Sequence, residues 1–131
     1  MNTVTFPDTN VLLRYLLADV EEQYQAIRPF FETLKQGQEK AVILPEVFLE
    51  TFYVLTRTYS IPAKEAAEAL KDLLLYKGVV NKDKKLLLEA FNLFLGSKGL
   101  NLLDCFLCVK TQKQKGKILT FDEKLQRKCG P

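Results

Sequence analysis

Acidic residues recur at the points where one apolar segment ends and the next begins. Asp8 separates a short apolar run from an apolar helix, Asp104 lies in NLLDCFLCV, and Asp122 ends KILTFD. A single acid at such a point is an ordinary helix N-cap, because Asp and Asn are favoured there. Several acids in equivalent places indicate a functional site instead. Polar neighbours, Thr9 and Asn10 beside Asp8 and Thr120 before Asp122, favour the same interpretation.

The helix predicted after Pro45 carries two acids, Glu46 and Glu50, on one face because they are four residues apart. Glu46 lies in the first turn, where the helix dipole stabilises an anion, so it needs no further explanation. Glu50 has apolar neighbours on both sides, and we expect it to be half-buried. A buried carboxylate without a partner is costly, so Glu50 needs a cation. A metal ion is one candidate, and Arg57 is the other.

Missing residue types narrow the chemistry further. The 131 residues include no histidine, which excludes a Ser-His-Asp triad and zinc held by imidazole. No glycine-rich phosphate loop is present. Carboxylates therefore remain as the reactive groups.

Predicted strands and helices alternate along the chain, which favours an α/β fold with a mostly parallel sheet and helices on both faces. The predicted strands are 1–6, 41–44 and 117–121, with a weaker candidate at 78–80; the predicted helices are 10–18, 21–35, 45–59, 61–74, 86–95, 101–114 and 122–128. Working residues of such sheets lie beyond the carboxyl ends of the strands. This places Asp8, Asp122, Glu46 and Glu50 at one edge of the sheet.

The overall composition predicts one domain, with a formal net charge of +3 that permits a polyanionic partner. No apolar run is long enough for a membrane span, and the N-terminus does not resemble a signal peptide. We therefore expect a cytoplasmic protein. The lysines of KQKGK, Lys113, Lys115 and Lys117, are typical of a solvated helix end, and phosphate contact is the alternative.

The three cysteines, an odd number, argue against a disulfide framework. Cys105 and Cys108 form a C-x-x-C spacing inside an apolar helix, which we interpret as core filling. Asn101 and Asp104 have the spacing of a capping box, the alternative to a site at Asp104.

The chain resembles PIN-domain nucleases, in particular the VapC-like toxins of toxin–antitoxin pairs. The resemblance is carried by DTNVLLRYLL, LPEVFLETFYVLTRTY, the helix of Asp104 and GKILTFD. It implies a single PIN-like domain over 1–131, a three-layer α/β/α sandwich with a mostly parallel central sheet. It also implies a catalytic metal pocket formed by Asp8, Glu50, Asp104 and Asp122, with Asn10 and Thr120 in support. Glu50, not Glu46, matches the family position.

The activity implied by the resemblance is Mg²⁺- or Mn²⁺-dependent endoribonuclease cleavage of RNA. The implied partners are a small antitoxin protein and a second copy of the chain in a homodimer. NLLDCFLCVK departs from the family pattern by carrying cysteines where small, alanine-like residues are usual. Three alternatives stay open: a non-catalytic RNA-binding PIN-like module, an aspartate-based phosphotransfer enzyme, which would need a D-x-D motif, and a receiver domain, which would need a lysine after a late strand.

Overall fold

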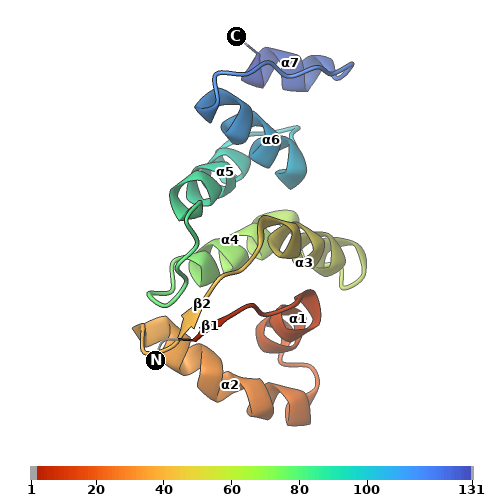
Figure 1. Cartoon of the computed structure of the whole chain (residues 1–131). Helices are drawn as coiled ribbons and strands as arrows, with labels where there is room; N and C mark the ends of the chain where they lie inside the picture. Colours follow the sequence, from red (N-terminus) through yellow and green to blue (C-terminus); the bar gives the residue numbers. More distant parts are fainter. Residues whose placement is uncertain (1–2, 131) are drawn as a thin grey trace. The chain divides into compact units, whose positions relative to one another are not determined.

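A computed structural model describes residues 3–130 as a mostly helical protein with a small parallel sheet of two strands (Figure 1). The elements in chain order are β1 Val4–Thr5, α1 Thr9–Leu17, α2 Glu21–Gln36, β2 Lys40–Ala41, α3 Pro45–Arg57, α4 Ala63–Leu74, α5 Lys84–Gly96, α6 Leu102–Lys113 and α7 Glu123–Cys129. They form two compact units, Met1–Lys82 and Asp83–Pro131, which we call the N-terminal and C-terminal units. Among residues 3–130, no helix has the length and apolar character to cross a bilayer.

The sheet of the N-terminal unit is shorter than the sequence predicts. β1 pairs in parallel with β2, with Val4 opposite Lys40. The weak strand predicted at 78–80 is a single parallel bridge between Ala41 and Val79. Of the strand predicted at 1–6, β1 contains Val4 and Thr5, and both residues are exposed. Residues 1–2 of that predicted strand lie outside the described part of the chain.

A buried asparagine extends the pairing beyond β2. Asn81 is 7% exposed, its Oδ1 accepts a hydrogen bond from Ile43 N at 2.9 Å, and its Nδ2 donates one to Ile43 O at 2.6 Å. One amide side chain thus satisfies both backbone groups of Ile43, as a neighbouring strand would. Pro45 then begins α3, where its missing N–H costs no hydrogen bond.

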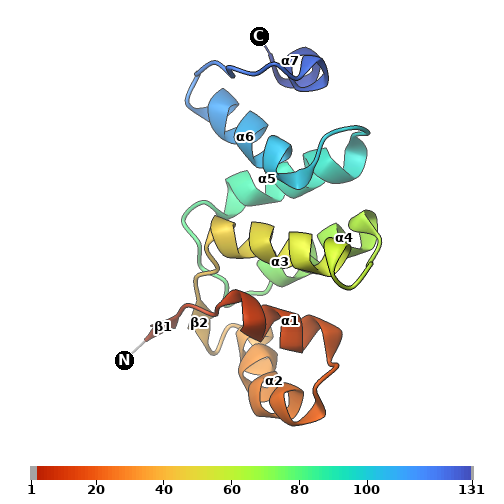
Figure 2. The same cartoon turned by 90° about the vertical axis from the view of Figure 1, so that its right-hand side faces the viewer.

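The core of the N-terminal unit lies between its helices. α1 packs against α2 and α3, and α3 packs beside α4 in both Figures 1 and 2. Tyr15 stacks on Phe31 with ring centroids 4.0 Å apart, and its hydroxyl lies 2.7 Å from that of Tyr76. Apolar residues three and four positions apart form these buried faces, as expected of amphipathic helices.

The C-terminal unit is helical among its described residues. α5 packs against α6, and α6 against α7. The strand predicted at 117–121 is wrong: this segment is not a strand, and Leu119 and Phe121 are fully exposed. Its β-forming composition is not enough, because a strand needs a partner and the described part of this unit contains none.

A disulfide joins α6 to α7. Cys108 is bonded to Cys129, with their Cα atoms 5.4 Å apart. The cysteines are buried, as the core-filling interpretation requires, but that interpretation missed the bond. The odd cysteine is Cys105, which is free and buried.

Candidate functional site

Asp8 is the N-cap of α1, as its sequence position allows. Its Oδ1 accepts a hydrogen bond from Val11 N at 2.9 Å. The side chain is exposed, and its other oxygen accepts no hydrogen bond or ion pair from residues 3–130. Capping therefore uses one oxygen of the Asp8 carboxylate and leaves the other oxygen available to a ligand.

A groove of about 280 Å³ lies beside Asp8 between α1 and α2. Its lining includes the predicted supporting residue Asn10 and a residue that the sequence analysis missed, Arg14. Arg14 donates hydrogen bonds to Asp19 Oδ2 and to Tyr59 Oη, both at 3.0 Å. The sequence feature that could have identified Arg14 is its position one helical turn after Asn10. The arrangement fixes the guanidinium in a groove that Asp8 shares.

Glu50 is exposed, so the expectation that it is half-buried is wrong. The buried side chains of α3 are Phe48, Thr51, Phe52 and Leu55. Residues two positions before and after Phe48 fall on the opposite side of the helix, which puts Glu46 and Glu50 in solvent. Arg57 is not the partner of Glu50: its guanidinium lies 4.5 Å from the ring centroid of Tyr53, a cation–π contact.

Because β1 and β2 pair in parallel, their carboxyl ends lie at the same edge of the sheet. Asp8 follows the carboxyl end of β1, and α3, with Glu50, follows that of β2. In open α/β sheets, ligands bind outside these strand ends. Of the four predicted acids, the N-terminal unit therefore carries a pair that follows the same edge of its sheet.

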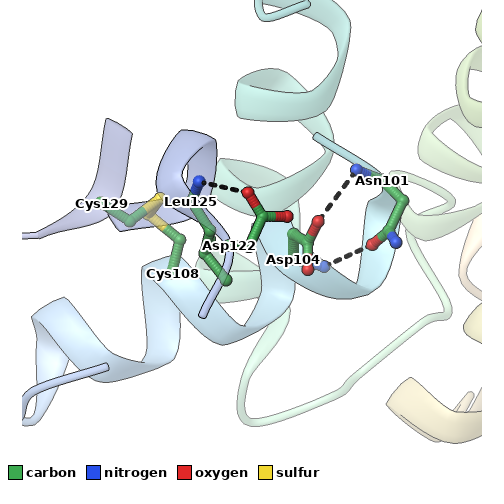
Figure 3. The surroundings of a disulfide bond; sticks show 6 residues. All are labelled: Asn101, Asp104, Cys108, Asp122, Leu125 and Cys129. Atoms are coloured by element: carbon green, nitrogen blue, oxygen red, sulfur yellow. Dashed lines mark hydrogen bonds between the residues drawn. A yellow bond between two sulfur atoms is a disulfide. The ribbon is translucent and has the colours of Figure 1, made fainter. Parts of the chain in front are cut away.

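Asp104 lies at the start of α6 in a capping box. Asn101 Oδ1 accepts from Asp104 N at 2.8 Å, and Asp104 Oδ2 accepts from Asn101 N at 3.3 Å (Figure 3). This confirms the capping-box spacing that the sequence shows. Only one oxygen of the Asp104 carboxylate is used, so capping does not occupy the whole group.

Asp122 is the N-cap of α7. Its Oδ1 accepts from Lys124 N at 2.9 Å and from Leu125 N at 3.2 Å, and its own backbone N donates to Thr120 Oγ1 at 3.0 Å. Thr120 thus supports Asp122 directly. Figure 3 shows the carboxylate of Asp122, at the start of α7, directed toward Asp104 on α6.

These acids share a chemical property. Asp8, Asp104 and Asp122 each use one carboxylate oxygen to accept hydrogen bonds from backbone N–H groups. Neither these aspartates nor Glu50 form an ion pair among residues 3–130. Free carboxylate oxygens are the ligands that Mg²⁺ prefers. Within the described residues, however, no three His, Cys, Asp or Glu side chains form a group that could hold a metal ion. Asp8 and Glu50 lie in the N-terminal unit, and Asp104 and Asp122 lie in the C-terminal unit.

The two units differ in charge. The N-terminal unit has nine basic and eleven acidic residues, whereas the C-terminal unit has ten basic and five acidic residues. Lys113, Lys115 and Lys117 belong to the basic unit and are exposed. A polyanion is therefore attracted to the C-terminal unit in particular.

Comparison with known proteins agrees with these features. The family model described as "PIN domain" matches residues 5–131. The chain is 31% identical over 121 residues to the VapC ribonuclease of Aquifex aeolicus (strain VF5), an alignment that covers 92% of this chain and 88% of that protein. No solved structure matches significantly. The family match over nearly the whole length, together with the acids at the ends of strands and the starts of helices, shows that the chain belongs to the PIN-domain family.

Proposed function

We propose that the protein is a metal-dependent endoribonuclease that hydrolyses RNA phosphodiesters with Asp8, Glu50, Asp104 and Asp122. The observation that carries the proposal is that each of the three aspartates uses only one carboxylate oxygen for capping hydrogen bonds. The other oxygen of each is free and suits a divalent cation. The similarity to a protein named as a ribonuclease supports the choice of reaction and substrate.

The donor set fits Mg²⁺ or Mn²⁺, since it consists of oxygens and lacks histidine. A bound divalent cation would lower the pKa of a water and screen the phosphate charge. The four acids would bind this cation, with Asn10 beside Asp8 and Thr120 holding the backbone of Asp122. Capping bonds restrict the rotation of three carboxylates, so less freedom is lost when they bind.

The biological part of the proposal is a toxin that acts in the cytoplasm and is neutralised by a small antitoxin. A homodimer and the three-layer α/β/α sandwich with a mostly parallel central sheet belong to the same proposal. Membership of the PIN-domain family and the name of the Aquifex relative support it.

The test is cleavage of a mixed single-stranded RNA pool by the full chain, with Mg²⁺, with Mn²⁺ and with chelator. We expect cleavage only with metal. Glu50→Gln should lower it by orders of magnitude, while the matched control Glu46→Gln, one turn earlier on the same exposed face, should keep it.

The opposite result for the two variants would move the assignment on α3 to Glu46. Metal-independent cleavage that survives Asp8→Asn would refute the proposed chemistry. RNA binding without any cleavage would favour the non-catalytic RNA-binding module, and transfer of phosphate to an aspartate would favour the phosphotransfer alternative.

A further inference from the structure

The disulfide links the two helices that carry the acids of the C-terminal unit. Asp104 and Cys108 are four residues apart on α6, and therefore lie on the same face of that helix. Cys129 ends α7, which begins directly after Asp122. Figure 3 shows the disulfide and the two carboxylates along the same α6–α7 contact.

Few other contacts hold α7 in place: Lys128 Nζ donates a hydrogen bond to Lys98 O, and the Lys124 side chain lies close to Gly99. The helix has 7 residues, of which only Leu125 and Cys129 are buried. The segment before it contains the fully exposed Leu119 and Phe121 and forms no strand. Such a short helix is unstable alone, so its docking depends on these few contacts and on the crosslink.

The two acids differ in their dependence on that docking. Asp104 is held by Asn101 within the first turn of α6, close in sequence and without help from α7. Asp122 is held by the backbone N–H groups of Lys124 and Leu125, which are directed at its carboxylate only while α7 is helical. Undocking of α7 would therefore release Asp122 and leave Asp104 in place.

We propose that the Cys108–Cys129 disulfide positions Asp122 beside Asp104, and that a dithiol reductant switches this pair off by releasing α7. Cys108 and Cys129 are positioning residues in this proposal. Its consequence for RNA cleavage rests on the proposed function, whereas its consequence for α7 does not.

The reaction is a thiol–disulfide exchange. A dithiol supplies two electrons and two protons. Its first thiolate breaks the Cys108–Cys129 bond and forms a mixed disulfide with one of the cysteines. Its second thiolate then breaks the mixed disulfide and releases that cysteine. The products are two cysteine thiols and the oxidised, disulfide form of the reductant.

Cys105 is a poor internal substitute for that reductant. It is free, but its side chain is completely buried. Buried structural cysteines of this kind are inert in thiol exchange. The state of the crosslink is then set by external thiols, which reduce disulfides in most cytosols.

The first measurement compares the metal-free full chain before and after treatment with dithiothreitol. Alkylation after unfolding should modify Cys105 alone before reduction and all three cysteines after it. Amide hydrogen exchange should then become several-fold faster in α7 on reduction, with the first turn of α6 and helices α1 to α4 unchanged. This readout requires neither metal nor RNA.

The second measurement is a titration with Mn²⁺ alone, followed by its electron paramagnetic resonance signal, and the same titration of RNA cleavage. Reduction should raise the Mn²⁺ concentration for half-saturation about tenfold, the size typical when the group that supports a metal ligand is removed. Excess Mn²⁺ should restore cleavage. A purely structural role would instead lower cleavage equally at every Mn²⁺ concentration.

Matched variants separate the crosslink from thiol chemistry in general. The double variant Cys108→Ala/Cys129→Ala should behave like the reduced protein and ignore dithiothreitol. Cys105→Ala, which also removes a buried thiol from α6, should keep the full difference between the oxidised and reduced forms.

Three results would overturn the proposal: alkylation of all three cysteines before reduction, equal exchange of α7 in both forms, or a Mn²⁺ half-saturation that reduction leaves unchanged. Absence of RNA cleavage in both forms would refute the proposed function instead, and the exchange and Mn²⁺ titrations would still decide the role of the disulfide.

Discussion

The N-terminal and C-terminal units hold their acids in different ways. Asp8 and α3 follow paired strands, and the helices around them bury a broad set of aromatic and aliphatic side chains. In the smaller C-terminal unit, Asp104 is held by a capping box, whereas Asp122 caps a short helix that a disulfide joins to α6. Small units bury less of their surface on folding and commonly need a crosslink. Carboxylates proposed for one reaction are thus positioned by a core in one unit and by a covalent bond in the other.

Neutralising one capping acid in each unit should have the largest effect on activity. In Asp8→Asn and Asp122→Asn the cap should survive, since Asn caps a helix about as well as Asp. RNA cleavage should nevertheless fall by orders of magnitude in both. Thermal melts should show that Mg²⁺ or Mn²⁺ raises the melting temperature of wild type through binding to the folded state, and does so less in either variant.

Alanine at the same positions provides the control. Asp8→Ala and Asp122→Ala should lose cleavage as the Asn variants do, and should also lose about 1 kcal/mol of stability with the cap. If Mg²⁺ or Mn²⁺ raised the melting temperature of Asp8→Asn as much as that of wild type, Asp8 would be only a helix cap.

Asn81 tests how far the N-terminal unit depends on its sheet. Asn81→Ala removes both hydrogen bonds to Ile43 and leaves a buried N–H and C=O without partners. Each such group costs about 1–3 kcal/mol. Urea denaturation should show this loss, and Lys82→Ala, at the exposed neighbouring position, should not. An unchanged midpoint for Asn81→Ala would mean that water replaces the amide.

The sequence predicts the helices of both units better than their strands. Helical periodicity and caps are local, so the helix order is confirmed, and the capping alternative is seen at Asp8, at Asn101 with Asp104, and at Asp122. The segment 117–121 has the composition of a strand, but pairing depends on a distant partner and is not encoded locally. The three-layer sandwich therefore stays a prediction.

Two other sequence predictions, for Glu50 and for the cysteines, differ from the structure for physical reasons. Glu50 was expected to be half-buried because its neighbours in sequence are apolar, yet those neighbours cover the opposite side of α3. The bond between Cys108 and Cys129 depends on a Cα–Cα distance of 5.4 Å, which spacing along the chain does not reveal. The odd number of cysteines instead argues against a disulfide framework, which is wrong for this pair. The grouping of the four acids in one pocket also stays a prediction.

The charge difference between the units predicts where RNA is held. Replacing Lys113, Lys115 and Lys117 by Ala should weaken RNA binding and flatten its dependence on salt by about one unit of slope for each phosphate-binding lysine removed. The control is a triple Ala variant of Lys64, Lys77 and Lys82, which removes the same charge from exposed positions of the N-terminal unit. Equal slopes for the two variants would show that only net charge matters.

The smallest expected effect is the alkaline pH dependence of stability, to which each unit contributes one group. In the C-terminal unit, burial raises the pKa of Cys105 from 9.0 to about 11. In the N-terminal unit, burial and the hydrogen bond with Tyr76 raise the pKa of Tyr15 above its ordinary value of 10.0. Both groups keep their protons in the folded protein at pH values where the unfolded chain releases them, so each opposes folding as pH rises through the unfolded pKa.

Wild type should therefore lose stability first from about pH 9, through Cys105, and further above pH 10, through Tyr15. Urea denaturation of the oxidised protein between about pH 7 and 11 should show Cys105→Ala without the first loss and Tyr15→Phe with a smaller second loss. A first loss that survives in Cys105→Ala would mean that this thiol does not carry the pH dependence of the C-terminal unit.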